Sequence, residues 1–187
     1  MSDISADIIK KAASGDVGAF EQIYRETSGF VYNVALRIAN NKEDAAEITQ
    51  DVFMKIYHNI KNFKGDSSFK TWAYRIAANT AINFLRARPR DVSGKIDIDE
   101  AQDIAYSGNA PRDNIDISAS EKRVEFLLSQ LKPEGRACIV LREMEGLDYK
   151  EMASALNTNI NTVRTRLKRA RAKLAGLVKK EGGQNEL

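Results

Sequence analysis

Apolar residues recur three and four positions apart along most of this 187-residue chain. That spacing is typical of helices that bury one face, and no run alternates apolar and polar residues in the way of a half-buried strand. The pattern therefore predicts an all-α protein. Helices are expected over Ile4–Ser14, Val17–Asn40, Lys42–Asn59, Ser68–Arg88, Ala119–Gln130, Pro133–Glu145, Tyr149–Leu156 and Ile160–Lys180.

Several of these helices carry end signals. Asp16 and Asn41 are predicted N-caps, and either Ser67 or Ser68 is expected to cap the fourth helix. Pro133 suits the first turn of its helix, where a backbone N–H has no partner within the helix.

The helical pattern stops between Pro89 and Ser118. Proline and glycine interrupt an acidic, polar run there, and a stretch of about thirty residues is longer than a compact domain usually contains as a loop. We therefore expect two small helical domains, 1–90 and 119–187, joined by a flexible acidic linker over 91–118.

Charge is distributed unevenly along the chain. Residues 61–90 carry seven bases and one acid, residues 91–118 carry two bases and seven acids, and Met152–Lys180 carry eight bases and no acid. The net charge of +3 conceals this division. Two basic blocks separated by an acidic one indicate two surfaces that face a polyanion.

The fourth helix has two faces on a helical wheel. The face expected to enter the core carries Phe69, Ala73, Ile76, Ala77, Thr80 and Phe84. A second face carries Trp72, Arg75, Asn79, Asn83 and Arg86, and the FKGDSS loop before the helix adds Phe63 and Lys64. An aromatic ring among cations and amides is the composition of a single-strand binding surface. A tryptophan half covered by a neighbouring helix would have the same spacing, so spacing alone leaves both interpretations open.

The third helix is expected to have an apolar and an acidic face. The predicted core residues are Ala45, Ile48, Val52, Phe53 and Ile56, and the predicted exposed residues are Asp44, Glu47, Gln50, Asp51 and Lys55. Such an acidic face is usually only solvated, although it could also dock on a partner protein.

Near the C-terminus, EGLDYKEMASALNTNINTVRTRLKRARAKL predicts a short helix, a tight turn and a long basic helix. The long helix has an apolar stripe of Ile160, Val163, Leu167, Ala170, Leu174 and Leu177. Opposite the stripe lie Asn161, Arg164, Thr165, Lys168 and Arg169, whose cations, hydroxyl and amide suit the major groove of DNA. A merely solvated face is the alternative, but it would usually contain acids that pair with the bases.

Enzymatic and metal-binding classes have little support. His58 is the sole histidine and Cys138 the sole cysteine, so no cysteine-histidine set can hold a metal and no disulfide can form within the chain. No phosphate-binding glycine loop, cofactor motif or small-molecule site is evident. Neither a signal peptide nor a membrane span is expected, and the single cysteine in an apolar segment fits a cytoplasmic location.

Two segments together resemble a known family. DAAEITQDVFMKIYHNIKNFKGDSSFKTWAYRIAANTAINFLR is similar to the second conserved region of bacterial sigma factors of the extracytoplasmic-function group, in the sigma-70 family. LDYKEMASAL and NTVRTRLKRARAKL are similar to the fourth region. The two matches occur in the expected order and cover most of the chain, whereas a helix-turn-helix alone would be a weak signal.

The resemblance implies a transcription initiation factor that binds core RNA polymerase, directs it to promoters and helps to open the duplex. It implies that Asp44, Ile48, Gln50, Asp51 and Phe53 belong to the polymerase-docking surface. It also implies that Phe63, Lys64, Trp72, Arg75, Asn79, Asn83 and Arg86 hold the unpaired strand of the −10 element. By the same resemblance, Asn161, Arg164, Thr165, Lys168 and Arg169 belong to the helix that reads the −35 element as duplex.

The sequence departs from the family pattern at three positions. Asp51 stands where many relatives have glutamate, Asn159 where many have proline, and Asn161 where many have glycine. The family also implies an anti-sigma partner, often membrane-anchored, and a linker that threads a polymerase channel.

Two other functional classes remain open from the sequence. A conventional regulator would bind an operator through the C-terminal helix without polymerase, and a single-stranded RNA-binding protein would use the 63–88 surface without promoter preference.

Overall fold

The computed structural model describes residues 4–87 and 119–183, and every regular element in these two ranges is helical. The all-α prediction is confirmed. The first range contains α1 (Ala6–Ala13), α2 (Val17–Ala39), α3 (Lys42–Asn59), the short 3₁₀ turn η1 (Ile60–Asn62) and α4 (Phe69–Ala87). The second contains α5 (Ala119–Ser129), α6 (Pro133–Ile139), the π-helical turn η2 (Val140–Met144), α7 (Tyr149–Ala155) and α8 (Ile160–Gly183). The predicted linker, 91–118, lies outside the described residues.

The predicted caps explain where several helices begin. The side chains of Asp16 and Asn41 accept the backbone N–H groups of Ala19 and Asp44, at 2.9 and 2.8 Å. Ser68, rather than Ser67, accepts the N–H of Thr71 at 3.0 Å before α4. Each bond satisfies a donor that the first turn leaves unpaired, so these local signals were sufficient to place the boundaries.

The predicted helix Pro133–Glu145 is not one continuous α-helix. It begins at Pro133 as expected, but from Val140 to Met144 the backbone widens into the π turn η2. Leu141 and Val140 accept the N–H groups of Leu147 and Glu145, and Gly146 takes a positive φ of 75° that closes the turn. Periodicity does not reveal such a single wide turn, because the apolar spacing around it stays helical.

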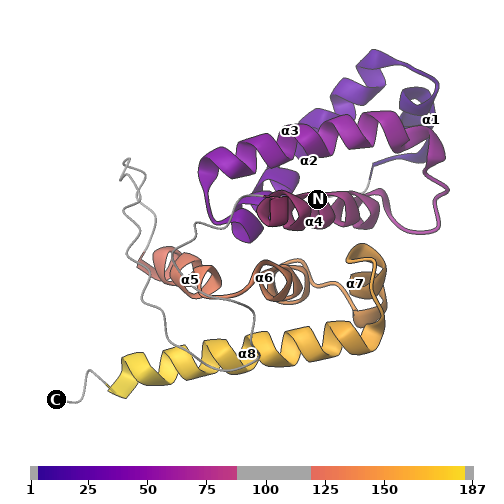
Figure 1. The fold of residues 1–187 in the computed structure, drawn as a ribbon. Helices are drawn as coiled ribbons and strands as arrows, with labels where there is room; N and C mark the ends of the chain where they lie inside the picture. The colour runs from indigo at the N-terminus through magenta and orange to yellow at the C-terminus, as the bar shows by residue number, and fades with distance from the viewer. Residues whose placement is uncertain (1–3, 88–118, 184–187) are drawn as a thin grey trace.

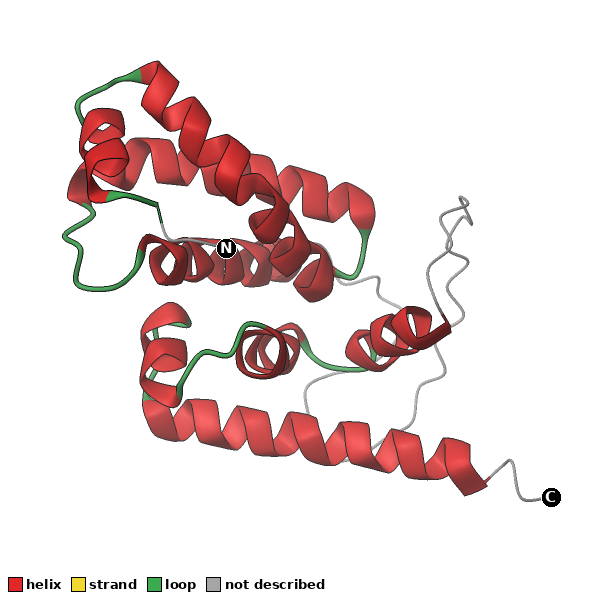
Figure 2. Ribbon diagram, turned by 180° about the vertical axis from the view of Figure 1, so that it is seen from behind, coloured by secondary structure: helices red, strands yellow, loops and turns green. Residues whose placement is uncertain are grey.

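The N-terminal bundle of α1–α4 lies over the C-terminal bundle of α5–α8 (Figure 1). Figure 2 shows the same two layers from behind, with α8 forming the outer edge of the C-terminal bundle. Helix α4 is the N-terminal element that lies along α6 and α7, and the C-terminal half of α2 contacts α6 as well.

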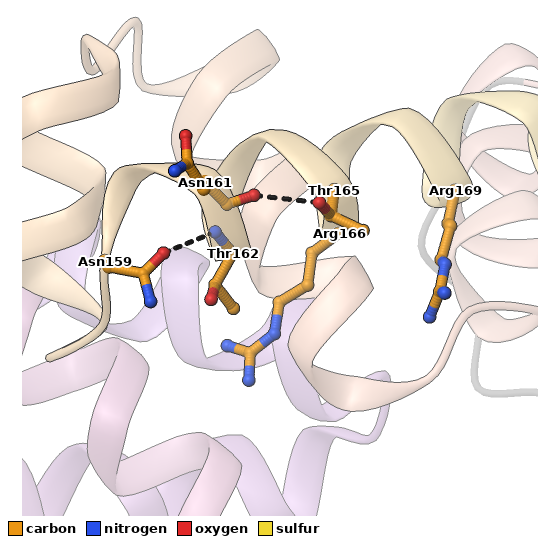
Figure 3. Close-up of a pocket in the computed structure, with 6 residues that line it drawn as sticks. All are labelled: Asn159, Asn161, Thr162, Thr165, Arg166 and Arg169. Carbon is orange, nitrogen blue, oxygen red and sulfur yellow. Dashed lines mark hydrogen bonds between the residues drawn. The ribbon is translucent and has the colours of Figure 1, made fainter.

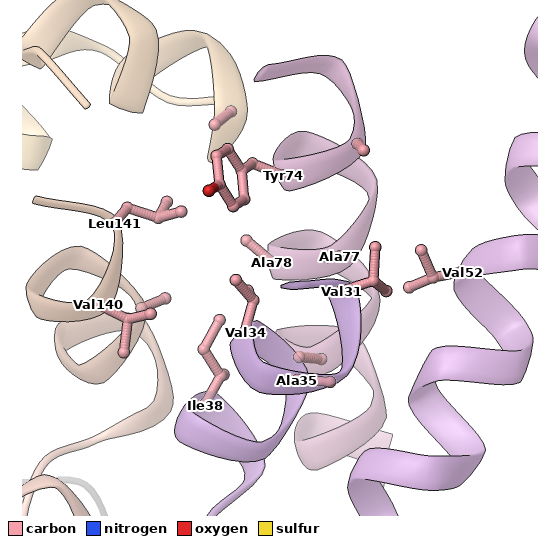
Figure 4. Close-up of a cluster of buried hydrophobic side chains, with 14 of the residues drawn as sticks. Val31, Val34, Ala35, Ile38, Val52, Tyr74, Ala77, Ala78, Val140 and Leu141 are labelled. Atoms are coloured by element: carbon pink, nitrogen blue, oxygen red, sulfur yellow. The ribbon is translucent and has the colours of Figure 1, made fainter. Parts of the chain in front are cut away.

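One hydrophobic core runs through both bundles. Val34 and Ile38 on α2 and Tyr74 on α4 face Val140 and Leu141 of the C-terminal bundle, whereas Val31 on α2 points toward α3 (Figure 4). All six residues are at most 2% exposed. The two bundles therefore bury apolar surface against each other as well as within themselves.

Helix α4 is buried on two sides, whereas the sequence predicted one. The predicted core face is correct for Phe69, Ala73, Ala77 and Thr80, which are all buried. Tyr74 and Ala78 form a further buried strip that faces the C-terminal bundle (Figure 4). The wheel missed this strip because tyrosine and alanine are common on exposed faces too.

The apolar stripe of α8 is also confirmed. Val163, Leu167 and Ala170 are buried, and Leu174 and Leu177 are half-buried. The backbone of α6 lies close to this stripe at Gly135. A Cβ atom added to Gly135 would lie 3.6 Å from the Cβ atom of Ala170 on α8.

We expect Leu167→Ala to lower the free energy of unfolding by about 2–5 kcal/mol, because it opens a cavity in the C-terminal core. Leu177→Ala is the matched control, since Leu177 is only half-buried and its truncation should cost clearly less. Urea denaturation followed by circular dichroism measures both. Equal losses would contradict the packing described for α8.

Candidate nucleic-acid interfaces

The first candidate interface is a shallow hollow of about 470 Å³ between α3 and α4, here called the α4 hollow. Its lining comes from the C-terminal end of α3, the turn η1 and one side of α4. The lining residues are Lys55, Asn59, Asn62, Trp72, Arg75, Ile76, Asn79, Thr80 and Asn83. Four of the predicted strand-binding residues, Trp72, Arg75, Asn79 and Asn83, are thus brought together in one place.

Trp72 is partly packed, as the structural interpretation predicted, and partly accessible, which the binding interpretation requires. Its ring is half-buried and packs against Phe63 and Phe69, with centroid distances of 5.3 and 5.5 Å. The rest of the indole lines the α4 hollow. Phe63 and Phe69 therefore contact the side of the indole that does not line the hollow. These contacts fix the position of the exposed part of the ring.

Lys55, Asn59 and Asn62 line the α4 hollow although sequence reasoning did not assign them to it. The Lys55 ammonium donates to the Thr80 hydroxyl at 3.0 Å, which holds this cation at the hollow. A signal was available, because Lys55 and Asn59 are four residues apart and so share one side of α3. Finding their neighbour on α4 required the packing of the two helices.

The remaining strand-binding candidates lie outside the hollow. Lys64 is exposed in the loop before α4, and Arg86 is exposed in its last turn. The Arg86 guanidinium donates to Glu134 of α6, with the Nε–Oε1 distance at 2.8 Å. Burial alone would raise the pKa of Glu134, but hydrogen bonds from its own backbone N–H and from Arg86 hold that pKa below its ordinary value.

The second candidate interface is a hollow of about 480 Å³ at the start of α8, here called the α8 hollow (Figure 3). Its lining residues are Asn159, Asn161, Thr162, Thr165, Arg166 and Arg169. Asn161, Thr165 and Arg169 were predicted, whereas Asn159, Thr162 and Arg166 were not. Thr162 and Arg166 lie beside the apolar stripe, where the polarity of a residue does not show whether its side chain is buried or exposed.

Two local hydrogen bonds order the start of α8. The Asn159 side chain accepts the N–H of Thr162 at 2.7 Å, and the Thr165 hydroxyl donates to the Asn161 carbonyl at 2.9 Å (Figure 3). Asn159 therefore acts as the N-cap, a role for which asparagine is well suited. Arg169 is exposed, whereas Arg166 is half-buried and lies near Glu134 of α6.

Arg164 and Lys168 do not line the α8 hollow. Both are exposed on another flank of α8, and the Arg164 guanidinium lies 5.7 Å from the ring centroid of Tyr149 on α7. Arg142 lies 5.2 Å from the same centroid. Tyr149 and Arg142 thus extend the basic surface from α8 onto the neighbouring elements, a feature that sequence reasoning missed.

The predicted docking residues on α3 divide into two groups. Ile48 and Phe53 are buried as core residues, and so is Asp44, which the sequence wrongly placed on the exposed face. Asp44 is in the first turn of α3, where the packing of α2 and the cap at Asn41 enclose it. Gln50 and Asp51 are exposed and are the predicted docking residues that remain on the surface.

Large apolar side chains accompany these two residues. Met54 and Tyr57 of α3 and Tyr24 of α2 are 58%, 47% and 47% exposed. Phe20 packs edge-on against Tyr57 and Tyr24 against Phe53, which connects the surface rings to the core. Exposed rings beside acids form a surface suited to a protein partner.

Comparison with known proteins identifies the family. Residues 23–90 match Sigma-70 region 2, and residues 121–174 match Sigma-70, region 4. The chain is 32% identical over 170 residues to the RNA polymerase sigma-H factor of Pseudomonas aeruginosa and 33% identical over 170 residues to the ECF RNA polymerase sigma-E factor of Escherichia coli, with 88% of each chain covered in both cases. The chain belongs to the extracytoplasmic-function group of RNA polymerase sigma factors.

Solved structures agree with this assignment. The sigma factor resembles CnrH, solved in complex with the cytosolic domain of CnrY, with a TM-score of 0.66, 25% identity and coverage of 95% and 99% of the two chains. It also resembles the sigma factor RpoE of Bartonella quintana, solved in complex with the anti-sigma factor NepR, with a TM-score of 0.62, 25% identity and coverage of 87% and 98%.

As a member of this family, the protein is a transcription initiation factor that binds core RNA polymerase, directs it to specific promoters and promotes strand opening. The α4 hollow lies within the region 2 match and the α8 hollow within the region 4 match. In the described parts of the sigma factor, no helix combines the length and the apolar character needed to cross a bilayer.

We expect Asn159→Ala to weaken the start of α8 by about 1 kcal/mol, because it removes the N-cap acceptor. The amide of Thr162 should then exchange with solvent faster, as measured by hydrogen exchange in the free sigma factor. Asn161→Ala is the matched control. It removes the same type of side chain two residues further along the chain and leaves the hydrogen bond between Asn159 and Thr162 intact. Equal protection in the two variants would contradict the capping role.

Proposed function

We propose that this sigma factor grips promoter DNA at two places and docks on polymerase at a third. Residues 1–90 form the domain that docks on polymerase and holds the melted −10 strand, residues 119–187 form the domain that reads the −35 duplex, and residues 91–118 connect them. The observation that carries the proposal is the α4 hollow, where aromatic, cationic and amide side chains meet without a catalytic group.

The α4 hollow has the groups that an unpaired strand needs. Trp72 offers a supported ring face on which a base can stack, and Arg75 and Lys55 supply positive charge for the phosphates. Asn79 and Asn83 can donate to and accept from base edges. Stacking one base contributes roughly 1–3 kcal/mol, which is comparable to the free energy lost when a base leaves the duplex. A few such contacts therefore shift the promoter toward the open state without ATP.

Phe63, Lys64 and Arg86 complete this surface in the proposal. Phe63 fixes the tryptophan, Lys64 lies in the adjoining loop where an extruded base could enter, and Arg86 extends the positive charge to the end of α4.

The α8 surface suits a duplex. Asn161, Thr165 and Arg169 point outward from the first turns of a helix whose opposite side is buried, so the helix can enter a groove without losing its packing (Figure 3). Arg169 can form paired hydrogen bonds with guanine or hold a phosphate, and Asn161 can pair with adenine. Arg164 and Lys168 would hold the backbone on the neighbouring flank.

Polymerase docking is proposed for the exposed side of α3. Gln50 and Asp51 supply the polar contacts, and Met54 and Tyr57 supply apolar area that a partner would cover. Asp44, Ile48 and Phe53 are buried, and their packing holds α3 in the position at which its other side can contact polymerase.

We also propose a cytoplasmic location and an anti-sigma partner. CnrH and the Bartonella RpoE were both solved with a protein partner, and the partner of CnrH is described as the cytosolic domain of a larger protein. By analogy, a membrane-anchored partner would hold this sigma factor at the inner face of the membrane.

An operator-binding regulator and a single-stranded RNA-binding protein are the rival functions. The first requires sequence-specific duplex binding without polymerase, and the second requires strand binding without promoter preference. Family membership argues against both, because each would use only one of the two hollows.

Transcription from promoter fragments with core polymerase, with and without this sigma factor, tests the proposal. Promoter-dependent RNA is expected only when the protein is added. We expect Trp72→Ala to reduce strand opening about tenfold, because a lost stacking contact weakens the open complex. Permanganate reactivity of unpaired thymines measures the opening, and duplex binding should change little.

Trp72→Phe is the matched variant for this experiment, because it keeps an aromatic face and should retain much of the opening. No promoter-dependent RNA on any fragment of the native genome would exclude the proposed function. Loss of duplex binding by Trp72→Ala would exclude the stacking role alone.

Arg169→Ala is expected to weaken recognition of the −35 duplex by about 1–3 kcal/mol and to relax the preference at one base pair. Lys173→Ala, four residues further along α8 and also exposed, is the control and should change affinity only weakly. Fluorescence anisotropy of the holoenzyme at fixed salt measures both. Indistinguishable variants would argue that α8 binds DNA elsewhere.

A further inference from the structure

Helix α1 lies at the end of the N-terminal bundle where α4 begins (Figure 1). It packs against α2 and against the turn η1, and it precedes residues 23–90, which match Sigma-70 region 2. The buried residues of α1 are Ile9 and Ala12, and the buried residue of η1 is Ile60. Apolar side chains are therefore available on both elements to fill the contact, which covers the turn between α3 and the loop before α4.

The turn η1 depends on such a contact for its position. It has only three residues in the 3₁₀ conformation, whose hydrogen bonds are less favourable than those of an α-helix. The Phe63 N–H donates to the Ile60 carbonyl at 3.1 Å, which ties Phe63 to the turn. The following residues, from Lys64 to Ser68, are all exposed, so packing of the loop does not fix Phe63. The position of Phe63 therefore follows that of η1 and α1.

The segment around η1 forms one wall of the α4 hollow. Asn62 of η1 and Asn59 directly before it line the hollow. The ring of Phe63 packs against Trp72 at a centroid distance of 5.3 Å and against Phe69 at 5.8 Å. Phe69 is buried in the core, whereas Phe63 is only half-buried and starts the exposed loop. A displacement of η1 would therefore move the amide wall and remove one of the two aromatic contacts of Trp72.

We propose that α1 is a positioning element for the promoter strand: by packing on η1 it holds Phe63, and thereby holds the exposed surface of Trp72 in place for stacking. This inference rests on the proposed function of the α4 hollow. Within the described residues, the lining of the hollow contains no side chain of α1. The effect of α1 on the strand is thus indirect, and Ile9 is a positioning residue.

Helix α1 is held mainly by its packing. Its eight residues are too few to form a stable helix alone in water. The Ser5 hydroxyl accepts a backbone N–H of the first turn at 3.4 Å, and the exposed pair of Asp7 and Lys11, at 2.9 Å, contributes little. Truncation of Ile9 should therefore loosen α1 and η1 while every residue of the hollow stays unchanged.

Fluorescence of the free sigma factor tests this directly, because Trp72 is the only tryptophan of the chain. Ile9→Ala should increase quenching of Trp72 by acrylamide, since a loosened Phe63 leaves more of the indole accessible. Ile38→Ala is the matched control, because it makes the same truncation at a buried residue near the other end of α2 and should leave quenching unchanged. Ile9→Leu keeps the apolar volume and should restore the value of the unmodified protein.

Promoter opening by the holoenzyme is the second measurement. On the fragment that gives RNA in the transcription experiment, Ile9→Ala should reduce the permanganate reactivity of unpaired thymines about threefold. This loss is smaller than that expected for Trp72→Ala, because the ring is still present. Binding to core polymerase and to the −35 duplex should not change, since the exposed side of α3 and the α8 surface are unaltered. A general loss of folding would reduce all three.

A second pair of variants weakens α1 without changing a buried side chain. Lys10 is exposed in the middle of α1. Glycine at this position destabilises a helix, whereas alanine favours it, and both substitutions remove the same charge. Lys10→Gly should therefore show more quenching of Trp72 and less opening than Lys10→Ala.

The possible results separate the inference from the proposed function. Unchanged quenching and opening in Ile9→Ala and Lys10→Gly, together with loss of opening by Trp72→Ala, would overturn the positioning role and keep the strand surface. An equal rise in quenching by Ile38→Ala would reduce the effect to general loosening of the bundle and also overturn it. If Trp72→Ala itself leaves opening unchanged, both the strand surface and its positioning by α1 are wrong.

Discussion

The burial of α4 from two sides is the interaction on which the rest of the structure depends. One side carries Phe69, Ala73 and Ala77 into the N-terminal core, and another presents Tyr74 and Ala78 to the C-terminal bundle (Figure 4). What remains exposed between them is the strip with Trp72, Arg75 and Asn83. Because the packing fixes the helix on both sides, the strip is held rigidly, and part of it is adjacent to the second bundle.

The basic residues of α8 and the carboxylates of the bundle interface are also in different places. Arg164, Lys168, Arg169 and Lys173 on α8 are exposed, whereas Glu134 and Glu145 lie where the two bundles meet. The carboxylates at the interface therefore attract the bundles to each other, and the cations on the outer helix stay available to a polyanion. A modest net charge of +3 is compatible with both roles, because the position of each charge matters more than the sum.

Much of the fold could be predicted from local patterns. The bounds of α3, the caps at Asp16 and Asn41 and the stripe of α8 depend on residues close in sequence, and the structure confirms them. The second buried strip of α4 depends on contacts between distant segments, which periodicity does not contain, and the π turn η2 leaves the apolar spacing around it helical. The same limit applies to Lys55, which joins the α4 hollow only because α3 packs beside α4.

The site residues divide in a similar way. Resemblance to a family identifies a motif but not the direction of each side chain, so Asp44, Ile48 and Phe53 were placed with the docking surface although they are buried. Trp72 could not be assigned from spacing because one part of its ring packs on Phe63 and another part lines the α4 hollow. Asn79 and Arg86 were predicted to bind DNA, and their contacts with the C-terminal bundle could not have been predicted from sequence.

The most direct test of this account is the distance between the two bundles in the free sigma factor. Fluorescent labels at cysteines introduced for the exposed Lys61 and Lys173 report it, since burial raises the pKa of Cys138 to about 11 and keeps that thiol unreactive. The account predicts a short and narrowly distributed distance, because α4 packs against both bundles. A long or broadly distributed distance in the free protein would contradict it.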